Sequence, residues 1–160
     1  MKNNRHTDLR RRLLKIYHLL LDAYGPQHWW PADSAFEMIV GAILTQSAAW
    51  VNVEKALDNL KAADKLSLKG LQQIPEAELA QLIYPSGYFN AKAHKLKAFV
   101  DHLAGYEDGL DGLFDQSTSE LRRELLGIHG IGEETADSVI VYAAGKPSFV
   151  IDSYTRRVVD

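Results

Sequence analysis

The sequence LLGIHGIGEETADSVI, residues 125–140, decides the fold because it places three glycines within six positions between two helical patterns. Glycine tolerates positive φ and close backbone approach, so this segment predicts a tight turn between two helices. Such a turn leaves amide groups pointing outward beside a helix N-terminus, an arrangement that binds phosphate. On glycine spacing alone, an ordinary helical hairpin with glycine caps fits equally well.

The rest of the chain is predicted to be helical nearly throughout. Apolar residues recur at helical spacing, and Ser34 with Glu37 and Ser117 with Glu120 form capping-box patterns. The predicted helices run from Thr7 to Gly25, from Ser34 to the break at Gln46–Ser47, through Val51 to Leu60, and over 68–73, 76–83, 91–103, 117–126 and 133–144. Residues 104–116 are expected to form a loop. The fold class is therefore all-α.

The overall composition is that of a globular domain large enough to bury a core. The 160 residues are 46% apolar and 24% charged, and they include no cysteine, which excludes disulfides and thiolate-bound metals within them. No apolar run could span a bilayer and no signal-peptide pattern is visible, so we expect a cytoplasmic protein without membrane contact. The net charge of −3 is a weak guide to partners, because nucleic-acid binding depends on where positive charges lie.

Three motifs in the chain resemble those of one enzyme family. Residues 128–136 read I-H-G-I-G-E-E-T-A, residues 150–153 read V-I-D-S, and residues 44–46 read L-T-Q. In order and separation they are similar to the helix-hairpin-helix, the catalytic aspartate segment and the upstream glutamine segment of the endonuclease III superfamily of DNA glycosylases. The resemblance covers roughly residues 30–160.

The resemblance implies a two-lobed, endonuclease III-like helical fold. Residues 1–28 would be a helix of the lobe formed by the two termini, and residues 29–147 a six-helix barrel-type domain with the helix-hairpin-helix at 118–144. Residues 148–160 would be a return segment that carries the catalytic aspartate. We expect the natural protein to continue beyond residue 160, with further C-terminal helices that are missing here.

Asp152 is the candidate catalytic residue. Taken alone, an aspartate at this position is more simply an N-cap of the last helix. The resemblance implies that it also drives base removal, and the two roles are compatible because a helix N-terminus favours the ionised carboxylate. A fixed anion stabilises the positive charge that develops on the sugar as an N-glycosidic bond breaks. The same carboxylate could orient or deprotonate the attacking water.

Glu134 indicates which reaction follows. Bifunctional relatives have a lysine immediately before the T-A pair, and this sequence has Glu134 there. A carboxylate cannot form a Schiff base with the sugar. We therefore predict a monofunctional glycosylase that uses water.

Trp29, Trp30, Pro31 and Trp50 are the candidate base pocket, with Glu134 beside it. Core packing would ordinarily explain such aromatic residues. However, W-W-P followed by F-E-x-I-V-G-A-I-L-T-Q resembles the endonuclease III-like 3-methyladenine DNA glycosylases, in which the matching aromatic residues sandwich the alkylated purine. A cationic base is attracted to aromatic faces, which suits this substrate.

The resemblance and the charge pattern also predict DNA contacts. Gln46 alone could be a polar residue in a helix–helix turn, but the resemblance favours a role in filling the space left by a flipped base. The other predicted DNA-binding residues are Gly130, Ile131, Gly132 and Thr135 of the hairpin and Lys92 and Lys95 upstream. The backbone of Ile128, Gly130 and Ile131 is a candidate site for a sodium or potassium ion.

The function predicted from the sequence is hydrolysis of the glycosidic bond of a flipped, damaged base in double-stranded DNA, most simply an alkylated purine such as 3-methyladenine. One alternative is an oxidised-pyrimidine glycosylase with lyase activity, and another is a non-catalytic DNA-binding module. We expect a nucleoid-associated monomer with no cofactor held by these residues. A [4Fe-4S] cluster, if present, would be ligated beyond residue 160.

Overall fold

The computed structural model describes residues 2–27 and 29–159. The chain forms two compact units, Met1–Pro31 and Ala32–Asp160. The first unit is built on α1, Lys2–Tyr24, which begins before the predicted start at Thr7 and ends where Gly25 adopts a φ of 68°. Its apolar side chains are largely exposed within the chain. Among the described residues, no helix combines the length and apolarity needed to cross a membrane.

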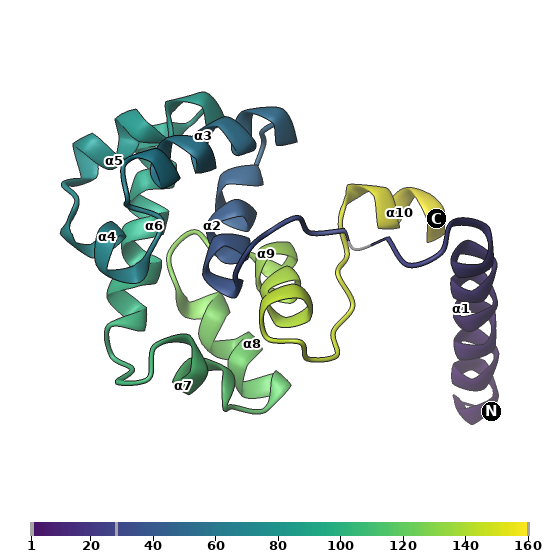
Figure 1. The fold of residues 1–160 in the computed structure, drawn as a ribbon. Helices are drawn as coiled ribbons and strands as arrows, with labels where there is room; N and C mark the ends of the chain where they lie inside the picture. Colours follow the sequence, from purple (N-terminus) through teal and green to yellow (C-terminus); the bar gives the residue numbers. More distant parts are fainter. Residues whose placement is uncertain (1, 28, 160) are drawn as a thin grey trace. The chain divides into compact units, whose positions relative to one another are not determined.

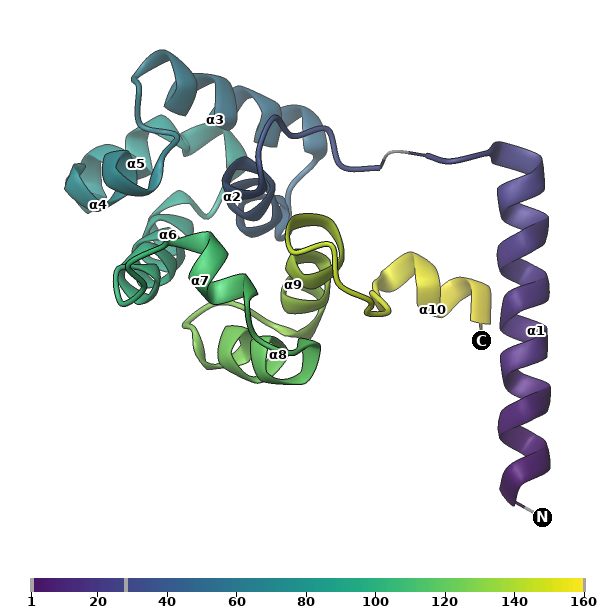
Figure 2. The same cartoon turned by 60° about the horizontal axis from the view of Figure 1, so that its bottom comes forward.

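The second unit is organised around one buried helix, α2, Ala35–Thr45 (Figure 1). Ser34 caps its first turn by accepting a hydrogen bond from the Glu37 amide at 3.1 Å, as its sequence predicts. All residues from Glu37 to Leu44 are buried, because α2 contacts helices on both of its sides. Figures 1 and 2 show α3 and α6 on one side of it and α9 on the other.

Five helical segments form one side of this unit. They are α3, Trp50–Ala62; α4, Leu68–Gln73; α5, Glu76–Leu82; the 3-10 turn η1, Tyr84–Ser86; and α6, Phe89–Leu103. The α6 helix begins two residues before the predicted start at Ala91, because Tyr88, in a left-handed conformation with a φ of 45°, precedes its first turn. Completely buried leucine, valine and phenylalanine side chains of α3 and α6 pack into the core.

The other side of the unit holds the helical hairpin. The predicted loop 104–116 contains a short helix, α7, Leu110–Phe114, so the loop prediction was wrong over these residues. Leu113 is fully buried there, and this single apolar anchor outweighs the glycine and aspartate content on which the loop prediction relied. The helix α8, Thr118–Gly127, has the predicted capping box between Ser117 and Glu120.

The second hairpin helix changes geometry along its length. It begins as α9, Glu133–Ser138, and continues as a π-helical segment, Val139–Ala143, labelled η2. The sequence predicted one regular α-helix over 133–144. After Gly145, whose φ is 63°, an extended segment leads to α10, Ser153–Val159.

Candidate functional site

The hairpin turn has the backbone geometry that its glycines predict. Gly130 has a φ of 85°, and Gly132 is the N-cap of α9 in an extended conformation. The Ile131 amide donates to the Ile128 carbonyl at 3.1 Å, and both isoleucine side chains are buried. The apolar residues of the turn therefore anchor it in the core, while Gly132 and the exposed start of α9 remain at the surface.

A partly buried ion pair ties the two hairpin helices together. Arg122 of α8 donates through Nε to Oδ1 of Asp137 at 2.9 Å and through a terminal nitrogen to Oδ2 at 3.1 Å. Ser148, in the segment after the hairpin, donates to the same carboxylate at 2.7 Å. Burial acts to raise the pKa of Asp137, but these hydrogen bonds and the guanidinium charge outweigh it, so the pKa is lowered. This pair could not be predicted from the sequence, because nothing local links positions 122, 137 and 148.

Gln46 lies against the hairpin rather than free at the surface. Its Nε2 donates to the Gly130 carbonyl at 3.0 Å and to Oγ1 of Thr135 at 3.1 Å. Its Oε1 accepts a hydrogen bond from Nζ of Lys95 at 2.6 Å. The structure thus brings four of the predicted DNA-binding residues together: Gln46, Lys95, Gly130 and Thr135. Whether Gln46 enters DNA stays a prediction.

Lys92 was predicted to face DNA, and the structure corrects this. Its side chain is only 1% exposed, and Nζ donates to the Leu44 carbonyl at 2.7 Å and to the Ser86 carbonyl at 2.6 Å. The ammonium therefore joins the end of α2 to η1 inside the core, where no phosphate can reach it. Burial, and secondarily the charge of Lys95, lowers the pKa of Lys92 to about 8.

We expect Lys92→Met to change how stability depends on pH. The pKa of Lys92 is lower in the folded protein than in the unfolded chain, whose reference value is 10.5, so between pH 8 and 10.5 the unfolded chain binds the extra proton. The free energy of unfolding of the wild type should therefore rise across this window relative to the variant, by at most about 3 kcal/mol. Urea unfolding of both proteins from pH 7 to 10.5 measures the difference. Parallel curves would contradict the burial of a titrating ammonium.

Asp152 occupies the predicted N-terminal position of the last helix. Its Oδ1 accepts a hydrogen bond from the Thr155 amide at 2.6 Å, and the side chain is half-buried. Burial acts to raise the pKa of Asp152, but hydrogen bonds from the backbone and hydroxyl of Thr155 and from the Tyr154 amide lower it overall. The carboxylate is thus held ionised, with Oδ1 occupied by the cap.

The predicted base-pocket residues fall in different parts of the chain. Trp29 is 70% exposed and lies with Trp30 and Pro31 in the first unit, whereas Trp50 begins α3 in the second. Glu134 is exposed on the first turn of α9. Their grouping around a base stays a prediction.

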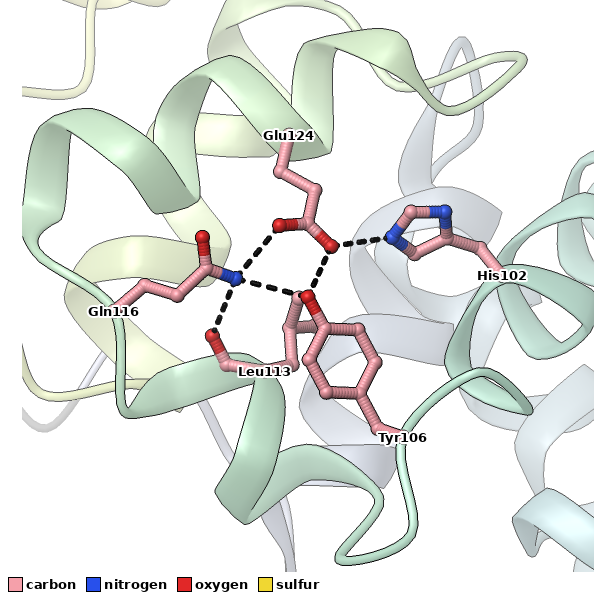
Figure 3. Close-up of polar contacts among 5 residues, drawn as sticks. All are labelled: His102, Tyr106, Leu113, Gln116 and Glu124. Carbon is pink, nitrogen blue, oxygen red and sulfur yellow. Dashed lines mark hydrogen bonds and ion pairs between the residues drawn. The ribbon is translucent and has the colours of Figure 1, made fainter.

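A polar cluster surrounds Glu124 of α8, and nothing in the sequence indicated it (Figure 3). The Glu124 carboxylate accepts hydrogen bonds from Nε2 of His102 at 2.6 Å, from the Tyr106 hydroxyl at 2.5 Å and from Nε2 of Gln116 at 2.6 Å. Burial acts to raise the pKa of Glu124, and these three donors lower it overall. The cluster fixes α8, the first helix of the hairpin, to the end of α6.

The monovalent cation at the hairpin carbonyls stays a prediction. Ile128 and Gly130 each accept one hydrogen bond through the carbonyl oxygen, from Ile131 and Gln46 respectively. A carbonyl oxygen has two lone pairs, so each retains one for a cation. An iron–sulfur cluster does not fit these residues, because the chain has no cysteine.

Comparison with known proteins defines the family. Residues 40–160 match the HhH-GPD superfamily of base excision DNA repair proteins. The "Putative DNA repair glycosylase" of Methanocaldococcus jannaschii is 45% identical over 148 residues, which are 91% of this chain and 67% of that protein. The structure is also similar to H. pylori 3-methyladenine DNA glycosylase (MagIII) bound to 1,N6-ethenoadenine, with a TM-score of 0.73 and 34% identity over 89% of this chain and 67% of that one.

A solved structure of lower sequence identity supports the fold but not the function. An endonuclease III in a non-covalent complex with DNA has a TM-score of 0.72 and 21% identity, and the match covers 96% of this chain and 67% of that one. The chain thus spans about two thirds of the length of these relatives. It belongs to the HhH-GPD superfamily of base excision DNA repair proteins, and its all-helical fold is that of the endonuclease III-like DNA glycosylases. The predicted family and fold class are confirmed.

Proposed function

We propose that this chain forms the catalytic core of a monofunctional DNA glycosylase that removes a flipped, damaged base by hydrolysis. The observation that carries the proposal is the ionised carboxylate of Asp152, held by the backbone at the start of α10 in a chain of this family. Structures of relatives bound to DNA, such as the endonuclease III complex, support double-stranded DNA as the partner.

In the proposed reaction, the bond between C1′ of the sugar and the base nitrogen breaks, and its electron pair leaves with the base. Asp152 stabilises the positive charge that develops on the sugar, because its fixed anion needs no reorganisation as the bond breaks. A water oxygen then bonds to C1′, and its proton passes to the carboxylate or to solvent. The hairpin amides would position the DNA backbone without reading its sequence. A sodium or potassium ion held by the carbonyls of Ile128, Gly130 and Ile131 would add positive charge toward phosphate.

The hydrolytic rather than lyase outcome rests on Glu134. It occupies the position before Thr135 and Ala136 on the first turn of α9, where an amine would be required for a Schiff base. Its exposed carboxylate cannot provide one. The proposal therefore assigns no covalent intermediate to this chain.

We infer that the substrate is an alkylated purine such as 3-methyladenine. This inference is supported by the 34% identity to the H. pylori 3-methyladenine glycosylase and by the tryptophans at positions 29, 30 and 50. The aromatic faces of these residues would attract a cationic base. Trp29 is mostly exposed within its own unit, which leaves its indole available to a base.

Base release from defined duplexes tests the proposal. The full-length protein should release 3-methyladenine from methylated DNA and leave the abasic strand intact. Borohydride should trap no covalent complex. Release of an oxidised pyrimidine with borohydride trapping would instead identify the lyase alternative. Duplex binding without release of any lesion would identify a non-catalytic module and overturn the enzyme proposal.

A further inference from the structure

The contacts of Gln46 fix the orientation of its carboxamide without ambiguity. A lysine ammonium can only donate hydrogen bonds and a backbone carbonyl can only accept them. The oxygen Oε1 must therefore face Lys95, and the nitrogen Nε2 must face Gly130. The second hydrogen of Nε2 is directed to the buried hydroxyl of Thr135, at 3.1 Å. Lys95 thus decides which end of the amide reaches the hairpin.

The stem of Lys95 also contacts the turn directly. A Cβ placed on Gly130 would lie 2.2 Å from Cγ of Lys95 and 2.5 Å from its Cδ. The glycine backbone therefore rests on the aliphatic part of this lysine. One side chain from α6 thus supports the turn through its methylenes and holds Gln46 through its ammonium.

We infer that Lys95 is a positioning residue for the hairpin. Through Gln46 it holds the Gly130 turn and the first turn of α9 in the conformation that binds the DNA backbone. The inference rests on the proposed function for the identity of the ligand. It differs from the phosphate contact that the sequence predicts for Lys95, because the ammonium is directed to a protein oxygen 2.6 Å away. Gln46 and Lys95 are both half-buried, so the contact is not an exposed pair screened by solvent.

Substitution of Lys95 by methionine tests the inference, since methionine keeps much of the stem and removes the ammonium. Loss of one charge-assisted hydrogen bond should raise KM for a damaged duplex about tenfold, with a smaller change in kcat. Lys95→Arg should recover most of the affinity, because a guanidinium can still donate to Oε1 of Gln46.

Lys97→Met is the matched control. Lys97 lies on the same helix, and its ammonium donates to the carbonyls of Leu71, Gln72 and Ile74 at the end of α4. Its substitution removes the same charge and also breaks internal hydrogen bonds, but it does not touch the hairpin. If Lys97→Met raised KM as much as Lys95→Met, general destabilisation would explain the effect and the inference would be wrong.

The salt dependence of duplex binding separates positioning from direct phosphate contact. A lysine that neutralises one phosphate contributes about 0.9 to the slope of log affinity against log salt concentration. Lys95→Met should weaken binding and leave this slope unchanged. A slope reduced by about 0.9 would assign Lys95 to the DNA backbone and overturn the inference.

Backbone amide resonances of the free protein provide a test that needs no DNA. Lys95→Met should shift the NMR signals of Gly130, Ile131 and Gly132, and Lys97→Met should leave them in place. Unchanged hairpin signals in Lys95→Met would contradict the inference. Because this measurement is independent of base release, failure of the proposed glycosylase reaction would not be confused with failure of the positioning role.

Discussion

Replacing Asp152 by asparagine should slow base release by at least about a hundredfold, since it removes the fixed charge that stabilises the developing cation. The substitution keeps the shape of the side chain, and asparagine is as good an N-cap as aspartate. Its amide oxygen can still accept the hydrogen bond from Thr155 that starts α10. Single-turnover base release should therefore fall while affinity for the duplex remains within about twofold.

The pH dependence of the wild type provides a second measurement on the same group. Because the pKa of Asp152 lies below its usual value of 3.8, the carboxylate stays ionised well into the acid range. Base release should show no loss from Asp152 protonation between pH 7 and 5.

The matched control for Asp152→Asn is Asp115→Asn, which alters an exposed carboxylate after α7 and should leave the rate of base release unchanged. If Asp115→Asn lowered the rate of base release as much as Asp152→Asn, Asp152 would have no specific role in the mechanism.

Asp137→Asn should be the most destabilising conservative substitution in the hairpin. Either orientation of an asparagine amide would place an N–H donor against Arg122, which donates to both carboxylate oxygens in the wild type. Asp137 is only 6% exposed, so water can relieve the mismatch only from the side of the partly exposed Arg122. We expect a loss of about 2 kcal/mol in the free energy of unfolding and a fall in Tm of roughly 4–8 °C.

Calorimetry of Asp137→Asn and of the control Asp101→Asn, which alters an exposed aspartate of α6, checks this expectation.

The contribution of Asp137 to the free energy of unfolding depends on pH with a defined sign, because its folded-state pKa is lowered below 3.8. Its contribution to stability is present above the unfolded-state pKa and is lost as the pH falls through the folded-state value. The difference between wild type and Asp137→Asn should therefore shrink below pH 4. A difference that did not shrink below pH 4 would have another cause.

Most of the fold could be predicted from local sequence. The capping residues Ser34 and Ser117, the glycines of the hairpin and the apolar periodicity of α2 act within a few residues of themselves, so their effects are visible in the sequence. Asp152 was placed at a helix start by the same local reasoning. These features depend on short-range backbone hydrogen bonds.

The misplaced residues depend on contacts between distant parts of the chain. Lys92 shares a helix with Lys95 and Lys97, and nothing in the sequence shows that its ammonium meets carbonyls of Leu44 and Ser86 inside the core. The Glu124 cluster similarly joins α6, the following loop and α8. Lys92 was predicted to face DNA and Glu124 was not singled out, whereas tertiary hydrogen bonds offset the cost of burying each charge.

The π-helical segment Val139–Ala143 has a consequence for the evolution of this chain. A π-helical turn accommodates one residue more than an α-helical turn, so the segment is equivalent to a one-residue insertion within the helix. Because the extra residue is taken up within this one turn, deleting it would restore regular α-helical geometry and leave the residues on either side in nearly the same orientation. The segment leading to Asp152 would then still leave the helix in its present direction. Relatives that lack one residue within 139–143 should therefore keep the same fold.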